Sequence, residues 1–180
     1  RNPESLSALA GNLALVGTQH LTTVNHVHIN EALSQSPGAW ISRGNGQEHL
    51  TALRSPVLTG AGACGEFLMA EDLIPLRAAG FCNVNQLFEA NTEQAQRIEV
   101  IRGPGSALYG SNALHGLINV VSQPPSAHYN STVGLDSGPH DYRRLKVSVG
   151  GPVNDHALRL STNFTHDGGY KRDAGFDQQK

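Results

Sequence analysis

The feature that most limits the possible folds is a pair of apolar runs joined by a glycine-rich turn, between residues 97 and 123. The first run, Ile-Glu-Val-Ile at residues 98–101, is rich in β-branched side chains and favours a covered strand. Gly-Pro-Gly at residues 103–105 ends it, because proline fixes φ and removes a donor while glycine permits a sharp turn. Residues 117–121 form the next strand. The sequence therefore predicts two strands joined by a tight supersecondary turn.

A strand followed by glycines could also begin a phosphate-binding loop, so we compared this turn with the two common nucleotide fingerprints. A dinucleotide fingerprint would need a third glycine where the chain has Leu108. A P-loop would need Gly-Lys-Ser or Gly-Lys-Thr where the chain has Gly110-Ser111-Asn112. The pattern thus disfavours a nucleotide cofactor.

The whole segment resembles the signature of the plug domain of TonB-dependent outer-membrane receptors. The matching positions are Ile98, Glu99, Val100, Arg102, Gly103, Pro104, Ser106, Ala107, Tyr109, Gly110, Ala113, Gly116, Ile118 and Asn119. The resemblance implies an α+β plug domain that fills a β-barrel in the outer membrane of a Gram-negative bacterium. It also implies a receptor that binds a scarce nutrient and imports it when TonB moves the plug.

Composition restricts the function further. The 180 residues carry a formal net charge of −2 and no basic stripe, which speaks against a nucleic-acid partner. No apolar run reaches the 18 residues of a transmembrane helix. Ser106 does not lie in a nucleophile elbow, and we expect no enzyme activity. Nine histidines occur, with His26 and His28 on one face of an expected strand, but metal-ligand spacing is missing, so we expect no metal or other cofactor.

The two cysteines, Cys64 and Cys82, flank an expected hairpin at residues 67–77 and lie beyond its open end. They could form a disulfide worth roughly 3 kcal/mol, which would indicate an oxidising compartment. Two buried free thiols are the alternative.

Three regions are expected: an extended lead at 1–12, a plug domain at 13–125 and antiparallel strands of an incomplete transmembrane β-barrel at 126–180. In the plug domain we expect a small mixed sheet and short helices. We expect a short helix that Thr18 caps and that continues to Val24, and a second from Glu31 to Gln35 after an Asn30 cap. A third is expected at residues 91–96, capped by Asn91 or Thr92.

After residue 125, three segments alternate apolar and polar side chains around Val133, Val147 and Leu160. A soluble antiparallel sheet gives the same alternation, but after a plug signature we interpret these segments as barrel strands. Residues 168–180 are expected to be an exposed polar loop. Plug-containing barrels have roughly 22 strands, so we interpret the chain as the N-terminal piece of a longer receptor.

The resemblance places ligand contacts in three apical loops and a plug-to-barrel charge cluster at two strand ends. The ligand positions are Arg43, Gly44, Asn45 and Gln47, then Thr59, Gly60, Ala61 and Gly62, and then Arg77, Phe81 and Asn83. The charge cluster is Arg54, Glu99 and Arg102, whose arginines would pair with glutamates of the barrel wall. An ordinary surface ion pair is the alternative, and Ser55-Pro56 replaces the glycine that usually follows the first arginine.

The expected partners are a small-molecule or metal-complex ligand, outer-membrane lipid, and TonB, which would bind an upstream segment not recognised in residues 1–12. The second hypothesis is a secreted, disulfide-tied soluble domain that binds or interacts with another molecule. A soluble enzyme is the third.

Overall fold

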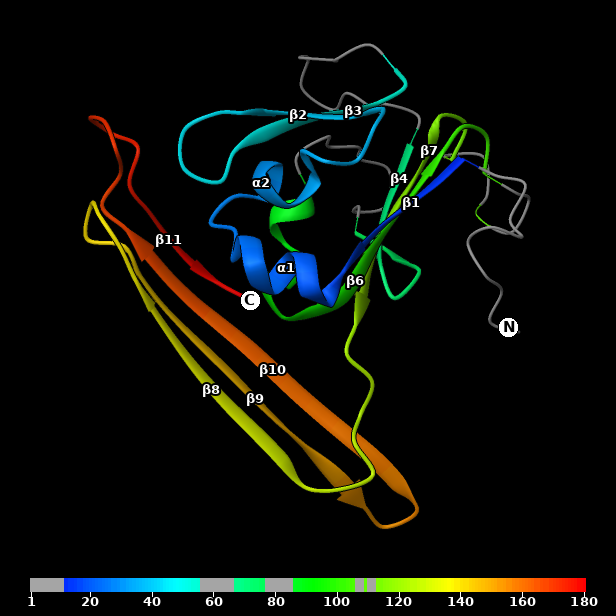
Figure 1. Ribbon diagram of the computed structural model, residues 1–180, viewed down its shortest axis with the longest axis vertical. Coiled ribbons are helices and arrows are strands. Elements are labelled where there is room, and N and C mark those ends of the chain that lie inside the picture. Colours follow the sequence, from blue (N-terminus) through cyan, green and yellow to red (C-terminus); the bar gives the residue numbers. More distant parts are fainter. Residues whose placement is uncertain (1–11, 56–66, 77–85, 106–108, 110–112) are drawn as a thin grey trace.

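The computed structural model describes residues 12–55, 67–76, 86–105, 109 and 113–180. These residues form two units: a mixed sheet with short helices, and a long antiparallel sheet that runs down one side of it and extends beyond it (Figure 1). This arrangement agrees with the expected α+β fold, in which a small mixed sheet with short helices is followed by antiparallel strands. Of the described helices, none has the length and apolar character needed to cross a membrane.

The mixed sheet has five strands in the order β1-β6-β7-β4-β5. Its neighbours pair antiparallel except β4 and β7, which are parallel. The strands are β1 (Asn12–Gly17), β4 (Phe67–Glu71), β5 (Ile74–Pro75), β6 (Ala95–Arg102) and β7 (Gly116–Ser122). The two predicted strands of the signature are thus the neighbouring strands β6 and β7.

Glycine is required where β7 begins. Gly116 has a φ of +150°, and a Cβ there would lie 2.2 Å from the carbonyl oxygen of Ile101. No side chain fits in that space, so β6 and β7 can approach closely only with glycine at this position.

The core lies on both faces of β6 and β7 because successive strand residues point to opposite faces. Ile98, Val100, Ile118 and Val120 are fully buried on the face covered by the helices, where Leu33 packs. Leu117 packs on the other face in a smaller cluster with Leu68, Ala70 and Ala113.

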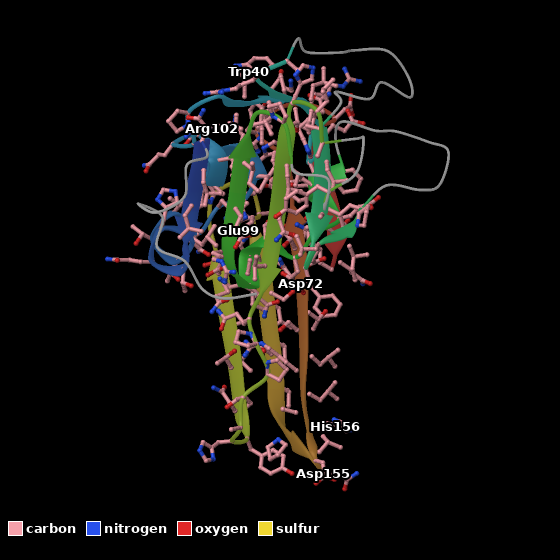
Figure 2. The ribbon with its side chains drawn as sticks, turned by 90° about the vertical axis from the view of Figure 1, so that its right-hand side faces the viewer. Trp40, Asp72, Glu99, Arg102, Asp155 and His156 are labelled. Atoms are coloured by element: carbon pink, nitrogen blue, oxygen red, sulfur yellow. The ribbon has the colours of Figure 1, made fainter. Side chains whose placement is uncertain are left out.

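Two α-helices and two 3₁₀ turns accompany the sheet: α1 (Thr18–Val24), α2 (Ile29–Leu33), η2 (Gln86–Phe88) and η3 (Thr92–Gln94). A separate hairpin, β2 (Ala39–Arg43) with β3 (His49–Leu53), lies above them (Figure 1). Trp40 of this hairpin marks the end of the molecule opposite Asp155 (Figure 2).

Three details of the helices differ from prediction. Gly17, not Thr18, is the N-cap of α1. Helix α2 begins at Ile29, two residues before the predicted start, because the His28 side chain caps it by accepting from the Asn30 N–H. The predicted helix at 91–96 is only the turn η3, since Ala95 already pairs with Ser122 in the sheet. Tertiary pairing therefore overrides the local capping signal.

The long sheet contains four antiparallel strands in the order β11-β10-β9-β8. They are β8 (Asn130–Ser137), β9 (Arg143–Val153), β10 (His156–Asp167) and β11 (Phe176–Gln179). The first three are the predicted amphipathic strands. The prediction of a polar loop over residues 168–180 is wrong in its last part, because β11 pairs with β10 from Phe164 to Asp167.

Candidate functional site

The long sheet has one apolar and one polar face, set by the alternation along each strand. The outward face presents large apolar side chains to the surroundings: Val133, Leu135, Val149, Leu158, Leu160 and Phe164. Leu135 is 79% exposed and Leu160 is 69% exposed. The inward face carries buried polar residues, Arg144, Ser148, Asn163 and Thr165. The polarity is therefore inverted with respect to a water-soluble sheet.

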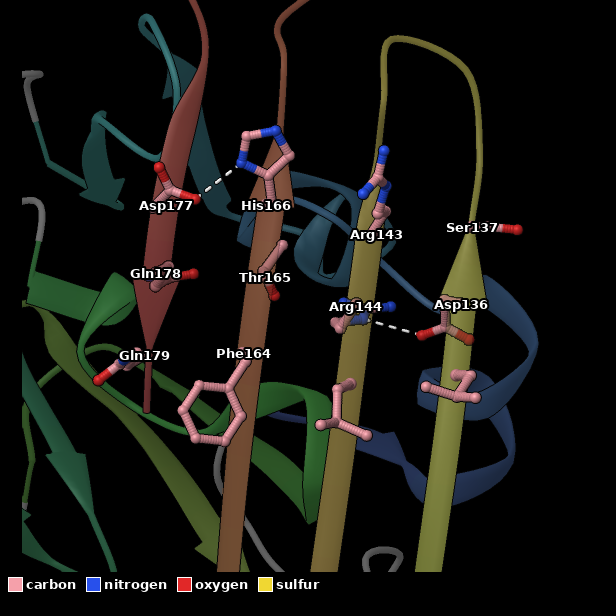
Figure 3. A pocket seen from close by; sticks show the side chains of 12 residues that line it. Asp136, Ser137, Arg143, Arg144, Phe164, Thr165, His166, Asp177, Gln178 and Gln179 are labelled. Atoms are coloured by element: carbon pink, nitrogen blue, oxygen red, sulfur yellow. Dashed lines mark hydrogen bonds and ion pairs between the residues drawn. The ribbon is translucent and has the colours of Figure 1, made fainter.

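The polar residues of the inward face bind the mixed-sheet unit through a group of contacts that we name the Arg144 cluster: Asn25, His26, Asp136, Arg144 and Lys146. Arg144 donates to the backbone oxygens of His26 (2.6 Å) and Asn25 (3.1 Å) and to Oδ1 of Asn25 (2.7 Å). Its Nε lies 2.9 Å from Asp136. A dashed line in Figure 3 marks this contact. Lys146 donates to the same Asn25 oxygen. A buried guanidinium is thus supplied with acceptors from both units, as a desolvated charge requires.

A second buried contact joins β11 to the turn η3. Lys180 Nζ lies 2.9 Å from Oε1 and 3.1 Å from Oε2 of Glu93, and both side chains are 4% exposed. Burial alone would raise the pKa of Glu93, but the ammonium of Lys180, helped by His26, holds that pKa below its ordinary value. Gln178 adds a hydrogen bond to the carbonyl oxygen of Phe88. The end of the chain is therefore ordered by charge pairing.

The first predicted ligand loop, residues 43–47, lies between β2 and β3, and Glu48 completes the connection; we call residues 43–48 the apical loop. Gly44 N–H donates to the Glu48 carbonyl, which closes the loop, and Gly46 has a left-handed φ of +58°. Arg43 pairs with Glu31 at 3.1 Å. Gln47 donates to the Val27 carbonyl at 2.7 Å. Two of the predicted ligand side chains thus also anchor the loop.

A cleft of about 500 Å³ separates the apical loop from the segment that contains β11. Its lining includes Asn45, Gln47 and Phe88 from one unit and Asp173 and Phe176 from the other. Amide, aromatic and carboxylate groups thus face a volume large enough for a small molecule. Arg43 lies close to the second unit as well, with its guanidinium 5.9 Å from the ring centre of Tyr170.

Three buried histidines lie near this region, and the ring of His49 meets that of the cleft residue Phe88 edge to face. His26 and His28 lie in the connection between α1 and α2, so the expectation that they share a strand face is wrong. Burial lowers the pKa of His26, His28 and His49 to about 4 in each case, so all three are neutral at pH 7. The His28 and His49 rings meet edge to face, with centroids 5.6 Å apart. Within the described residues, no group of three or more possible metal ligands occurs.

The predicted charge cluster is only partly brought together. Arg54 and Arg102 both pack against Gly38, where a Cβ would lie 3.5 Å from Arg54 Cγ and 3.2 Å from Arg102 Cδ. Glu99 is three residues from Arg102 along β6 and so points to the opposite face of the sheet. There it pairs with Arg97 at 2.8 Å and accepts from Asn119 at 3.2 Å. Figure 2 shows Glu99 and Arg102 at different heights on the sheet.

The remaining predicted site residues lie outside the described residues. They are Thr59, Gly60, Ala61 and Gly62 of the second loop, Arg77, Phe81 and Asn83 of the third loop, and the cysteines Cys64 and Cys82.

Sequence reasoning missed the residues that join the two units. For Arg144 a signal was available, because the alternation along β9 places it on the polar face with Lys146 and Ser148. For the pair of Lys180 with Glu93 no local signal exists, since β11 was not predicted and the partners are 87 residues apart.

Comparison with known proteins identifies the architecture. The family model of the TonB-dependent Receptor Plug Domain matches residues 5–117. Among solved structures, the ferric yersiniabactin uptake receptor FyuA from Yersinia pestis has a TM-score of 0.65 at 22% identity, over 91% of this chain and 25% of that one. The pyoverdine outer membrane receptor FpvA from Pseudomonas aeruginosa PAO1 has a TM-score of 0.66 at 21% identity, over 87% and 22%.

The siderophore receptor PirA from Pseudomonas aeruginosa has a TM-score of 0.64 at 19% identity, over 95% of this chain and 31% of that one. The chain thus spans between a fifth and a third of the length of these receptors. At these identities the likeness shows the fold.

Proposed function

The chain belongs to the family of TonB-dependent receptor plug domains, and on that premise we propose that it serves an outer-membrane receptor that binds a scarce extracellular nutrient and imports it with energy supplied through TonB. In this proposal residues 13–125 are the plug and residues 126–180 are the first strands of the barrel. The family consists of outer-membrane receptors of Gram-negative bacteria and not of enzymes. It gives no support to a secreted, disulfide-tied domain.

The observation that carries the proposal is the inverted polarity of the long sheet. Buried residues of its polar face, such as Arg144, contact the mixed-sheet unit, while its apolar face, including Leu135 and Leu160, is exposed. A bilayer would cover such a face, whereas in water it would be a liability. Arg143, His166 and Asp177 border the apolar band at the end of the sheet shown in Figure 3. This polar border suits the boundary between lipid and water.

The cargo would arrive at the apical loop. Arg43, Asn45 and Gln47 belong to this loop, and the cleft beside it is bounded on the other side by the barrel segment. We propose that the cargo is a small molecule or a metal complex held between plug and barrel. The named relatives are receptors for ferric yersiniabactin, pyoverdine and siderophores, which supports this class.

Growth on defined nutrients tests the function. A strain that lacks the full-length receptor should lose the use of one scarce nutrient, regain it with the wild-type gene, and lose it again when TonB is removed. Growth that depends on neither the receptor nor TonB for every nutrient tested would contradict the proposal.

A disulfide between Cys64 and Cys82 would tie the second apical loop to the third. Replacing both with Ser should therefore reduce uptake of the nutrient more than it reduces the amount of receptor in the outer membrane, measured by radiolabelled uptake and by quantitative membrane fractionation. Unchanged uptake at equal receptor levels would contradict the tied-loop proposal.

A further inference from the structure

One peptide group of the plug is bound from two sides. The peptide that joins His26 to Val27 accepts a hydrogen bond at its carbonyl oxygen from Arg144 Nη1, at 2.6 Å. Its N–H donates to Oε2 of Glu31, at 2.9 Å. Because the peptide unit is planar, a tilt imposed on one of these groups is transmitted to the other.

The barrel side of this arrangement is strongly constrained. Arg144 is 2% exposed and also binds both oxygens of Asn25, the residue that precedes His26. Asn25 has a left-handed φ of +44° and ends helix α1. The backbone from Asn25 to Val27 therefore has little freedom to move without altering the contacts of Arg144.

The apical loop reaches the backbone of Val27 through two of its residues, but only the path through Glu31 ends on the shared peptide. Oε1 of Glu31 accepts from Arg43 Nη1 at 3.1 Å, so a single carboxylate connects Arg43 to the N–H of Val27. Gln47 donates to the carbonyl oxygen of Val27 at 2.7 Å. Both backbone polar groups of Val27 are thus bound by the loop, one directly and one through Glu31.

We propose that Glu31 is a positioning residue that couples the apical loop to the Arg144 cluster, and hence to the hold of the barrel strands on the plug. The connection runs from Arg43 through Glu31 and the shared peptide to Arg144. Each of its hydrogen bonds has a charged side chain as donor or acceptor. Hydrogen bonds in such a series polarise one another, so a change at one end alters the strength of the other.

A cargo that engages Arg43 would compete with Glu31 for the guanidinium and so act on this connection. The inference rests on the proposed function only in taking the apical loop as the place where cargo arrives. The coupling itself does not depend on the identity of any cargo, and it can be measured without one.

Hydrogen exchange in the full-length receptor in detergent micelles tests the coupling. The amides of Gly44 and Glu48 report on the apical loop, because they donate within it at 2.7 and 3.1 Å. Arg144→Met should raise the exchange rates of these two amides about tenfold, as the loss of one charge-assisted hydrogen bond implies. The hydrogen bonds of Arg144 go to Asn25, His26 and Asp136 and not to the loop, so a change in the loop would have to be transmitted.

Arg143→Met is the matched control, since Arg143 lies on the outward face, pairs with Asp141 and should leave the loop unchanged. Arg144→Lys keeps the charge without the planar fork and should give a smaller rise. It keeps the test valid if Arg144→Met displaces the plug altogether.

A double substitution distinguishes coupling from independent structural damage. Glu31→Gln should by itself accelerate loop exchange, whereas Glu89→Gln, on an exposed side chain outside the loop, should not. In the Glu31→Gln receptor, Arg144→Lys should add little, because the connection is already broken. The proposal would be overturned if the two substitutions accelerated loop exchange independently, so that their effects on the rate multiplied. It would also be overturned if neither Arg144→Met nor Arg144→Lys changed the exchange of the loop. Since no uptake is measured, that failure would leave the proposed import function standing.

Discussion

The two sheets of this molecule use the same alternation of side chains with opposite results. In the mixed sheet, Ile98 and Ile118 are fully buried between strands and helices. In the long sheet, Leu135 and Leu160 point away from the protein while Arg144 is buried. The difference shows that periodicity determines which residues share a face, but that the surroundings of the sheet determine which face is the interior.

The buried charge of the long sheet should give the largest effect. Lys180→Met leaves the carboxylate of Glu93 buried without its partner, and should lower the stability of the plug in the barrel by about 3–5 kcal/mol. Hydrogen exchange of the full-length receptor at increasing urea concentrations measures this loss of stability. Adding Glu93→Gln to Lys180→Met should recover part of the lost stability, because it removes the unpaired carboxylate. Lys171→Met is the control: this lysine is exposed, and its substitution should have almost no effect on stability. A stability equal to wild type for Lys180→Met would show that the pair is not a structural contact.

The interior of the mixed sheet should come next. Ile98→Ala removes a fully buried side chain and should cost about 2–5 kcal/mol through lost burial and the cavity it leaves. The same exchange measurement applies to the amides of β6 and β7. Leu160→Ala is the comparison in the long sheet, and should leave the plug amides within error of wild type. Equal effects of the two substitutions on the plug would remove the distinction between the two sheets.

A charged substitution on the outward face of the long sheet tests whether that face contacts lipid. Leu160→Arg should cost about 2–4 kcal/mol of folding stability in lipid, because the apolar face would then hold a charge in the bilayer. Folding into vesicles, followed by electrophoretic mobility without heating, measures this loss. Equal folding of Leu160→Arg and Leu160→Ala would indicate that this face is in water.

Acid should have a graded effect on the mixed-sheet unit, and for each of its three buried histidines this effect should be smaller than those of the substitutions above. The folded-state pKa of His26, His28 and His49 is lowered to about 4, whereas in the unfolded chain it is near 6.5. Between pH 6.5 and 4 the unfolded state therefore binds more protons than the folded state. The free energy of unfolding decreases as the pH is lowered through that window.

Between pH 6.5 and 5.5 the loss should be about 1 kcal/mol for each histidine. Denaturation of the plug at several pH values measures the slope, and His49→Gln should reduce it. A flat profile between pH 6.5 and 5.5 would show that these histidines are not buried in the neutral form.

Local sequence determined much of the fold. The β-branched runs around Ile98 and Leu117 became β6 and β7, and Gly116 at the start of β7 lies where β6 leaves no room for a side chain. The alternation after residue 125 correctly predicted β8, β9 and β10. These features are visible because they depend on neighbours in the chain.

The apical loop was also predicted at residues 43–47, but the role of its residues was not. Arg43 and Gln47 anchor the loop to Glu31 and Val27, and those partners are identified only when the chain is folded. Likewise, Glu99 was expected in one charge cluster with Arg54 and Arg102, yet the strand places Glu99 and Arg102 on opposite faces of the sheet.

By itself, then, the sequence determined the family, the strand order along the chain and the two-faced character of the last strands. Only the tertiary structure decided that β11 joins the long sheet, that β6 replaces a predicted helix at Ala95, and that Arg144 and Lys180 bind the plug. The physical reason is that these contacts join residues about 90 to 120 positions apart, and such contacts produce no periodic pattern in the sequence. In the sequence alone, each partner looks like an ordinary polar residue.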